Sequence, residues 1–216
     1  MTKALVVGGS GLVGGHLLRQ LSAGARYDEI VALTRRPVGF ALPRVREVVV
    51  DLDRPESYRE HLAVDDVYCC LGTTIKKAGS QEAFRHVDLE IPLAVAEAAA
   101  GAGARQYLIV TAVGADARSR IFYSRVKGEL EEALARLPLT LKVFHPSFLL
   151  GERQESRPAE RVGVAVARAT RGLFVGGLTR YRAIAAADVA RAMIVAAGRD
   201  DGPRTVYEGK TLFALL

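Results

Sequence analysis

The chain has 216 residues, half of them hydrophobic, which suffices for one α/β domain with a full core and does not require two. No uninterrupted apolar stretch approaches the roughly 18 to 20 residues that span a bilayer, and the N-terminus leaves no room for a signal peptide, so we expect a soluble, cytoplasmic protein with no membrane partner. The net charge of +6 is spread along a chain without tryptophan, which favours phosphate-bearing small molecules over nucleic acid as partners.

The first predicted element is a short buried strand, Lys3–Val7, which leads through a glycine-rich turn into a helix over Leu12–Ala23. The glycines have the spacing G-x-x-G-x-x-G. The first permits a tight turn, the second lets a pyrophosphate approach the backbone, and the third lets the helix pack close to the sheet. The phosphates would bind at the positive end of the helix, although a purely structural turn also needs glycine. The predicted cofactor-binding residues here are Gly8, Ser10, Gly11, Leu12, Val13 and Gly14.

The second predicted strand, residues 30–34, is followed by Arg35 and Arg36. In NAD-selective proteins that begin with such a strand, glycine turn and helix, a carboxylate near the end of the second strand binds the adenosine ribose. In this chain the position offers two guanidinium groups, whose planar donors suit a 2′-phosphate. We therefore predict NADP(H) as the cofactor, with two solvated loop arginines as the alternative.

The third and fourth predicted strands, residues 45–50 and 66–71, also end at the cofactor. Asp51 follows the third strand and could reach the adenine amino group, or it could be an ordinary turn carboxylate. Cys69 and Cys70 are adjacent in the fourth strand, so we interpret them as small buried hydrophobes and not as a disulfide or metal site. The residues predicted to bind the cofactor in these segments are Asp51, Leu52, Leu71, Gly72 and Thr73.

Strands and helices alternate along the rest of the chain. Continuous apolar strands imply a parallel sheet that is covered on both faces, so we predict an α/β Rossmann-type doubly wound sheet with a small C-terminal substrate-side lobe. The whole chain, 1–216, would form one NAD(P)-binding domain, with a cofactor-binding core over 1–150 and the lobe over 151–216. The further strands predicted are 106–111, 139–144 and Arg204–Glu208, and the further helices are 81–102, 124–137, 158–170 and 187–197.

Tyr123 and Lys127 stand one helical turn apart, so their side chains share one face of a helix. A cation beside a phenol stabilises the phenolate, and we expect it to lower the pKa of Tyr123 towards neutrality. Such a tyrosine can exchange a proton with a carbonyl or an alcohol while a hydride moves elsewhere. An exposed helix with an incidental aromatic residue is the alternative.

Together these residues resemble the short-chain dehydrogenase/reductase superfamily, and within it the atypical Tat-interacting-protein-like oxidoreductases. The resemblance covers nearly the whole chain. Its implied cofactor is NADPH, while some members of the family are linked to regulation and not to metabolism. The segments that carry it, besides Tyr123, are Cys70-Leu-Gly-Thr-Thr74, Lys77-Ala-Gly79, Val87-Asp88, Gly114-Ala-Asp116, Val126-Lys-Gly-Glu129 and Arg153-Gln-Glu-Ser-Arg-Pro158.

The resemblance implies a role for each matching residue. Tyr123 matches the general acid/base, and Lys127 matches its partner, which also holds the nicotinamide ribose. Thr111 is the hydroxyl available where the superfamily usually has a serine that bonds the substrate oxygen, although a plain β-branched strand residue is the alternative. Asp88 stands where an asparagine often completes the proton relay, and Ala112 where relatives can carry a second serine.

The substrate side is expected to follow the sixth strand. His145 and Ser147 lie there and could contact substrate, while Arg153 and Arg157 belong to a polar segment that we predict to form a wall or lid. The leading hypothesis is an NADPH-dependent reductase of a small-molecule carbonyl compound. A binding module that senses NADPH and regulates a protein partner is the alternative, and no metal site is expected because the histidines lack ligand spacing.

Overall fold

The computed structural model describes residues 1–38, 41–150 and 176–216. Its centre is a sheet in the order β3-β2-β1-β4-β5-β6-β9, in which every neighbouring pair is parallel. This is the predicted doubly wound Rossmann arrangement. The strands are β1 Lys3–Val7, β2 Glu29–Thr34, β3 Val45–Val49, β4 Asp66–Cys69, β5 Gln106–Val110, β6 Thr140–His145 and β9 Arg204–Glu208.

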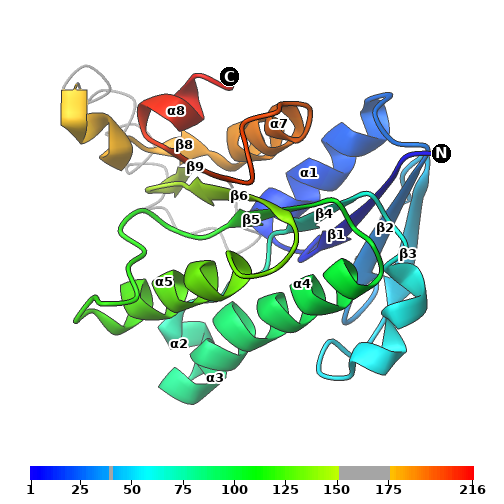
Figure 1. Ribbon diagram of the computed structural model, residues 1–216, viewed down its shortest axis with the longest axis horizontal. Helices are drawn as coiled ribbons and strands as arrows, with labels where there is room; N and C mark the ends of the chain where they lie inside the picture. Colours follow the sequence, from blue (N-terminus) through cyan, green and yellow to red (C-terminus); the bar gives the residue numbers. More distant parts are fainter. Residues whose placement is uncertain (39–40, 151–175) are drawn as a thin grey trace, which may run out of the picture.

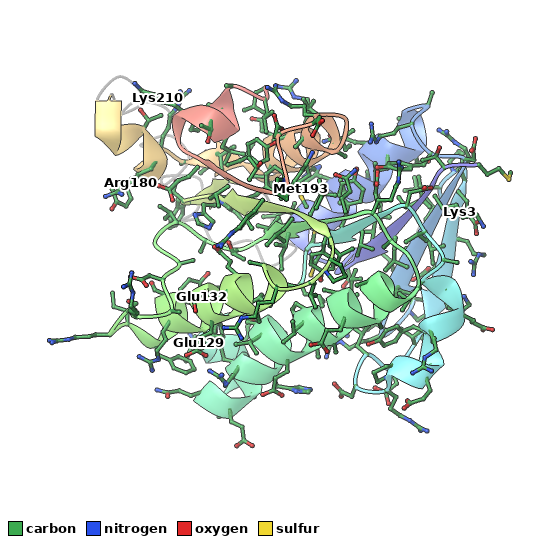
Figure 2. All side chains as sticks on the ribbon, viewed as in Figure 1. Lys3, Glu129, Glu132, Arg180, Met193 and Lys210 are labelled. Carbon is green, nitrogen blue, oxygen red and sulfur yellow. The ribbon has the colours of Figure 1, made fainter. Side chains whose placement is uncertain are left out.

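Helices cover both faces of the sheet, as continuous apolar strands require. Helices α4 (Ile91–Gly101) and α5 (Phe122–Leu134) lie on one face, and α1 (Leu12–Ala23) and α7 (Ala186–Ala197) lie on the other (Figure 1). Each layer has its own hydrophobic cluster, one including Val95 and Leu130 and the other including Leu17 and Met193. Met193 of α7 is fully buried and is labelled in Figure 2.

The predicted elements agree closely with the observed ones where periodicity is strong, and differ in one place that matters for function. Residues 81–102 are not one α-helix but α3 (Gln81–Arg85), a π-helical turn η3 (His86–Glu90) and α4. The π-helical turn is wider than a turn of α-helix, and the buried Asp88 lies in it. Such turns are frequent at functional sites, and a hydrophobic period does not reveal them.

The last part of the chain belongs to the same sandwich. Helix α7 packs on α1, and β9 pairs with β6 at the end of the sheet. A small second sheet joins β7 (Leu149–Leu150) to β8 (Ile184–Ala185), while the predicted helix over 158–170 lies outside the described residues. The remaining short elements are α2 Ile75–Ala78, α8 Lys210–Phe213, η1 Pro55–Ser57, η2 Arg59–His61 and η5 Gly176–Tyr181.

Among residues 1–38, 41–150 and 176–216, no helix is both long enough and apolar enough to cross a membrane.

Candidate functional site

A cavity of about 710 Å³ opens at the carboxyl ends of the strands. It lies beside β1 and β4, where the strand order reverses, which is the usual ligand position in open α/β sheets. Its size suits a small-molecule or cofactor site. The predicted site residues that line it are Ser10, Gly11, Leu12, Val13, Arg36, Leu71, Gly72, Thr73, Thr111, Tyr123 and Lys127.

The three glycines at and after the turn between β1 and α1 have different structural roles. Gly8 has a φ of +85°, and a Cβ added there would lie 2.6 Å from the carbonyl carbon of Cys70. A Cβ on Gly14 would collide with the carbonyl oxygen of Gly8. These two glycines serve the turn and the close packing of helix on sheet. Neither borders the cavity among the described residues.

Gly11 is different because it lies on the cavity wall, although an added Cβ would still fit tightly against the protein. The nearest atom to an added Cβ is the Gly8 carbonyl oxygen at 3.1 Å, and the residue is exposed on the cavity wall. As the N-cap of α1, Gly11 makes no side-chain capping bond. The first amides of the helix are therefore available to an anion, and the donor set fits the phosphates of a dinucleotide.

The arginines after β2 are separated by the structure. Both arginines are exposed, but Arg36 lines the cavity together with Pro37 and Val38, and Arg35 is not among the described lining residues. Glu47 of β3 holds this loop, because it accepts hydrogen bonds from Thr34 Oγ1 at 3.0 Å and from the Val38 amide at 2.6 Å. Of the two predicted arginines, Arg36 is the one that lines the described cavity wall.

Asp51 and Leu52 do not belong to the described cavity wall. The Asp51 carboxylate accepts a hydrogen bond from the Asp53 amide at 3.1 Å, and Leu52 is buried in the core with only 4% of its surface exposed. Both residues lie between β3 and η1, in a turn in which the Arg54 amide donates to the Asp51 carbonyl at 3.1 Å. The turn-carboxylate alternative therefore describes Asp51.

Lys127 and Asp88 form a buried ion pair beside the cavity. Lys127 Nζ lies 2.7 Å from Asp88 Oδ1, and the two side chains are 4% and 1% exposed. The other oxygen, Asp88 Oδ2, accepts the Thr73 amide at 2.8 Å. Gly128, next to Lys127, lets α5 approach the backbone of Asp116, since a Cβ there would collide with it. Asp88 thus acts as the counterion of Lys127, which the asparagine it replaces would not be.

Tyr123 lines the same cavity, and its ring packs on Phe84 with centroids 5.5 Å apart. Burial raises the pKa of Tyr123, Lys127 lowers it and Asp88 raises it, so that the pKa lies above its ordinary value. The expected fall of this pKa towards neutrality is therefore not found. Desolvation and the charge of Asp88 together outweigh the effect of the lysine, and the phenol keeps its proton at neutral pH.

Thr111 is on the cavity wall, but its hydroxyl is already engaged. It donates a hydrogen bond of 2.6 Å to Glu131 Oε1. His145 Nε2 lies 2.8 Å from the same oxygen, and His145 Nδ1 lies 3.0 Å from Glu208 Oε2. Thr111 therefore has no free proton with which to polarise a carbonyl in this arrangement.

The predicted substrate-side residues are only partly tested. His145 is 7% exposed and borders Glu131 instead of the described cavity wall, and Ser147 Oγ donates to the Arg182 carbonyl at 2.6 Å. Arg153 and Arg157 lie outside the described residues. Both His145 and Ser147 therefore bond within the protein and do not face the cavity.

Several lining residues were not predicted to bind a ligand. His16 and Arg19 follow Leu12 at i+4 and i+7, so the helical repeat of α1 could have pointed to them. Asp88, which the family resemblance places in the proton relay, enters the wall through the π turn, and the sequence carries no comparable signal for that turn. The other lining residues missed are Gly9, Gly15, Pro37, Val38, Cys70, Thr74, Val110 and Leu149. Lys77, which follows the fourth strand and could touch a phosphate or an anionic substrate but was interpreted as a solvated loop lysine, also lines the cavity.

Comparison with known proteins agrees with this geometry. The family model described as "NAD dependent epimerase/dehydratase family" matches residues 4–208. Protein HTATIP2 of Rattus norvegicus is 36% identical over 160 residues, which are 72% of this chain and 66% of the rat protein, just under two thirds. Protein FMP52, mitochondrial, of Candida albicans is 31% identical over 196 residues, 88% of this chain and 85% of that protein.

Solved structures share the fold at low identity. MoeE5 in complex with UDP-glucuronic acid and NAD has a TM-score of 0.72 and 19% identity, over 96% of this chain and 76% of that one. The dTDP-glucose 4,6-dehydratase DesIV of Streptomyces venezuelae, with NAD and TYD bound, has a TM-score of 0.73 and 17% identity, over 96% of this chain and 75% of that one. These matches confirm the predicted fold class.

The relatives also correct the expected location. Several FMP52 proteins of fungi carry the word mitochondrial in their names. The prediction of a cytoplasmic protein is contradicted by these relatives. It rested on the lack of a secretory signal peptide, and that feature does not distinguish the cytoplasm from an organelle such as the mitochondrion.

Proposed function

Because the chain belongs to the NAD dependent epimerase/dehydratase family, we propose that it is an NADPH-dependent oxidoreductase that reduces the carbonyl group of a small molecule. The observation that carries this proposal is that Tyr123 and Lys127 line one cavity with the open glycine turn at Gly11. A proton donor, a fixed cation and a phosphate-binding helix end are the parts that such a reduction needs.

The residues divide the binding of the cofactor among them. Gly11 and the first amides of α1 would bind the pyrophosphate, Arg36 the 2′-phosphate, and Lys127 the nicotinamide ribose. When bound, NADPH supplies the hydride. Gly72 is exposed on the same wall, and an added Cβ there would make only ordinary contacts with the protein, the nearest at 3.6 Å, so its small size serves the ligand better than it serves the fold.

Tyr123 would supply the proton. Its raised pKa keeps the phenol protonated at neutral pH, which suits an acid better than a base. The buried pair of Lys127 with Asp88 holds the ammonium group in one position. Preorganised charge of this kind stabilises developing negative charge on the tyrosine and the substrate oxygen without reorganisation.

A second candidate, an NADPH sensor with little turnover, is favoured by one specific observation. Thr111 donates its proton to Glu131, so the hydroxyl expected to polarise the carbonyl is engaged within the protein. Under this alternative, NADPH binding would change the affinity for a protein partner and no product would form.

One experiment separates the two candidates. NADPH and NADH are titrated by calorimetry, and NADPH oxidation is then followed with a panel of aldehydes, ketones and quinones that includes phenanthrenequinone. A reductase binds NADPH and oxidises it with at least one carbonyl compound, and Tyr123→Phe lowers this rate by roughly a hundredfold while NADPH binding is retained. Tight binding without turnover would favour the sensor, and full activity of Tyr123→Phe would contradict the proposed acid.

A further inference from the structure

The described wall of the cavity carries more positive than negative charge. Among its described residues the one carboxylate is Asp88, and that carboxylate is already paired with Lys127 at 2.7 Å. The other cationic side chains on the described wall are Arg19, Arg36 and Lys77. A cleft lined by charge of one sign concentrates ligands of the opposite sign, so the cavity favours anionic ligands.

The sheet order separates Lys77 from Arg36. Arg36 follows β2 and Lys77 lies on α2, which follows β4, and β1 lies between these two strands. Tyr123 and Lys127 belong to α5, which follows β5, the neighbour of β4 on the side away from β1. Lys77 therefore shares its side of the cavity with the proposed proton donor, and Arg36 lies across β1 from both.

The segment that leads to Lys77 contacts the buried ion pair. The Thr73 amide donates to Asp88 Oδ2 at 2.8 Å. A Cβ added to Gly72 would lie 3.6 Å from Asp88 Oδ1 and 3.9 Å from Lys127 Nζ. Lys77 follows Thr73 by four residues, so its helix begins beside the Lys127 ammonium group.

The backbone of Lys77 is held in place. Thr74 is the N-cap of α2, and its Oγ1 accepts a hydrogen bond from the Lys77 amide at 3.2 Å. Gly79 ends the helix with a φ of +84°, and its amide donates to the Ile75 carbonyl at 3.0 Å. Ala78 packs against the hydrophobic cluster to which α4 and α5 contribute. The side chain of Lys77 thus starts from a fixed point on the cavity wall.

The charge of Lys77 is not used by the described part of the protein. Across residues 1–38, 41–150 and 176–216 no acidic side chain forms an ion pair with it. Its neighbour Lys76 is also exposed but is absent from the described cavity wall. An ordinary solvated loop lysine is a description that fits Lys76, whereas Lys77 borders the cavity.

We propose that Lys77 binds an anionic group of the substrate, so that the carbonyl compound reduced at Tyr123 carries a carboxylate or a phosphate. This inference rests on the proposed function. There the cofactor phosphates bind to Arg36 and to the start of α1, and Asp88 neutralises Lys127. Lys77 is then the cation on the Tyr123 side of the described wall whose charge is available to a second ligand.

The test compares para-carboxybenzaldehyde with its methyl ester, which has a similar shape and no charge. Each is titrated by calorimetry into protein saturated with NADP⁺, the oxidised cofactor, so that affinity is measured without turnover. The wild type should bind the acid about fivefold more tightly than the ester, the scale expected for a partly solvated ion pair. This preference should disappear in Lys77→Gln, persist in Lys77→Arg and weaken as salt is added.

Lys76→Gln is the matched control, because it removes the same charge from the same helix at a position outside the described wall. It should keep the preference of the wild type for the acid. Equal loss of the preference in Lys76→Gln and Lys77→Gln would mean that only the overall charge of the protein matters, and would overturn the proposal.

Turnover with NADPH provides the second readout. The ratio of kcat/KM for the acid to that for the ester should fall in Lys77→Gln through a higher KM for the acid. A Lys77→Gln protein that keeps the wild-type ratio would overturn the anion site, and one that binds NADP⁺ more weakly would overturn it by assigning Lys77 to the cofactor. A wild type that prefers the acid but oxidises no NADPH with any carbonyl compound would contradict the proposed function and leave the anion site supported.

Discussion

Buried polar clusters occupy both edges of the sheet, and they differ in what they face. At the N-terminal edge Asp66 accepts hydrogen bonds from Tyr27 Oη at 2.5 Å and from Gln106 Nε2 at 2.8 Å. At the C-terminal edge Lys127 pairs with Asp88 beside a cavity. Figure 2 marks the two ends of the molecule, with Lys3 near the first edge and Arg180 and Lys210 near the second.

The side chains of the N-terminal cluster bond to one another and to backbone carbonyls. Gln106 also donates to the Ala197 carbonyl at 3.0 Å, and Lys142 Nζ donates to the Ala196 and Arg199 carbonyls at 2.6 and 2.5 Å. These bonds go to carbonyls at the C-terminal end of α7 and just after it, and they attach that helix to the sheet. Burial and charge alone therefore do not identify a functional site. The C-terminal cluster is distinguished because its members reach a cavity.

The largest expected effect is on the free energy of unfolding, and it should distinguish the N-terminal cluster from the C-terminal one. Asp66→Ala should lower the free energy of unfolding by about 3 to 5 kcal/mol, because Arg26, Tyr27 and Gln106 lose a buried charged acceptor. NADPH affinity of the folded protein should not change. Urea unfolding and calorimetry test both statements. Asp65→Ala, the partly exposed neighbour, is the control and should cost about 1 kcal/mol.

Lys127→Met tests whether the C-terminal pair also supports the fold. Leaving Asp88 buried without its cation should lower the free energy of unfolding by about 3 kcal/mol. The double variant Asp88→Asn/Lys127→Met should recover most of this loss, since no charge remains buried. Both variants should lose turnover, because Tyr123 then lacks its cation. A double variant that is active would contradict the role of Lys127.

A smaller effect should distinguish the two arginines after β2. Arg36→Ser should reduce the preference for NADPH over NADH by about tenfold, or 1.4 kcal/mol, because Arg36 lines the cavity. Arg35→Ser, whose residue is exposed and away from the described wall, should change the preference by less than about twofold. Competitive titration of the two cofactors decides. Equal effects of the two substitutions would contradict the assignment to Arg36.

The smallest effect concerns His145 and depends on pH. Its pKa is raised in the folded protein, so its stabilising contribution is complete below the unfolded pKa of about 6.5 and is lost as the pH rises through the folded pKa. His145→Gln should therefore lower the free energy of unfolding by about 1 kcal/mol near pH 5.5 and by less at higher pH. Urea unfolding over this range provides the measurement. A difference that grows with pH would reverse the assigned sign.

Local sequence patterns predicted several elements correctly but did not predict contacts between residues far apart in the chain. Strands Lys3–Val7 and Arg204–Glu208 and helix Leu12–Ala23 have the predicted bounds, because their signals are local runs of apolar residues and glycines. The glycine turn was predictable for the same reason. The engagement of Thr111 by Glu131 was not, since the two residues are 20 apart and meet only because α5 packs on β5.

By itself the sequence determined the fold class, the family resemblance, the glycine turn and the helical spacing of Tyr123 and Lys127. Each of these depends on residues within a few positions of one another, or on the order of apolar segments. Tertiary structure alone decided that Arg36 and not Arg35 lines the described cavity wall, that burial keeps the pKa of Tyr123 high although Lys127 lowers it, and that His145 stands between Glu131 and Glu208. The charge and hydrogen-bonding state of a buried group depend on which distant side chains the sheet order brings within about 3 Å of it.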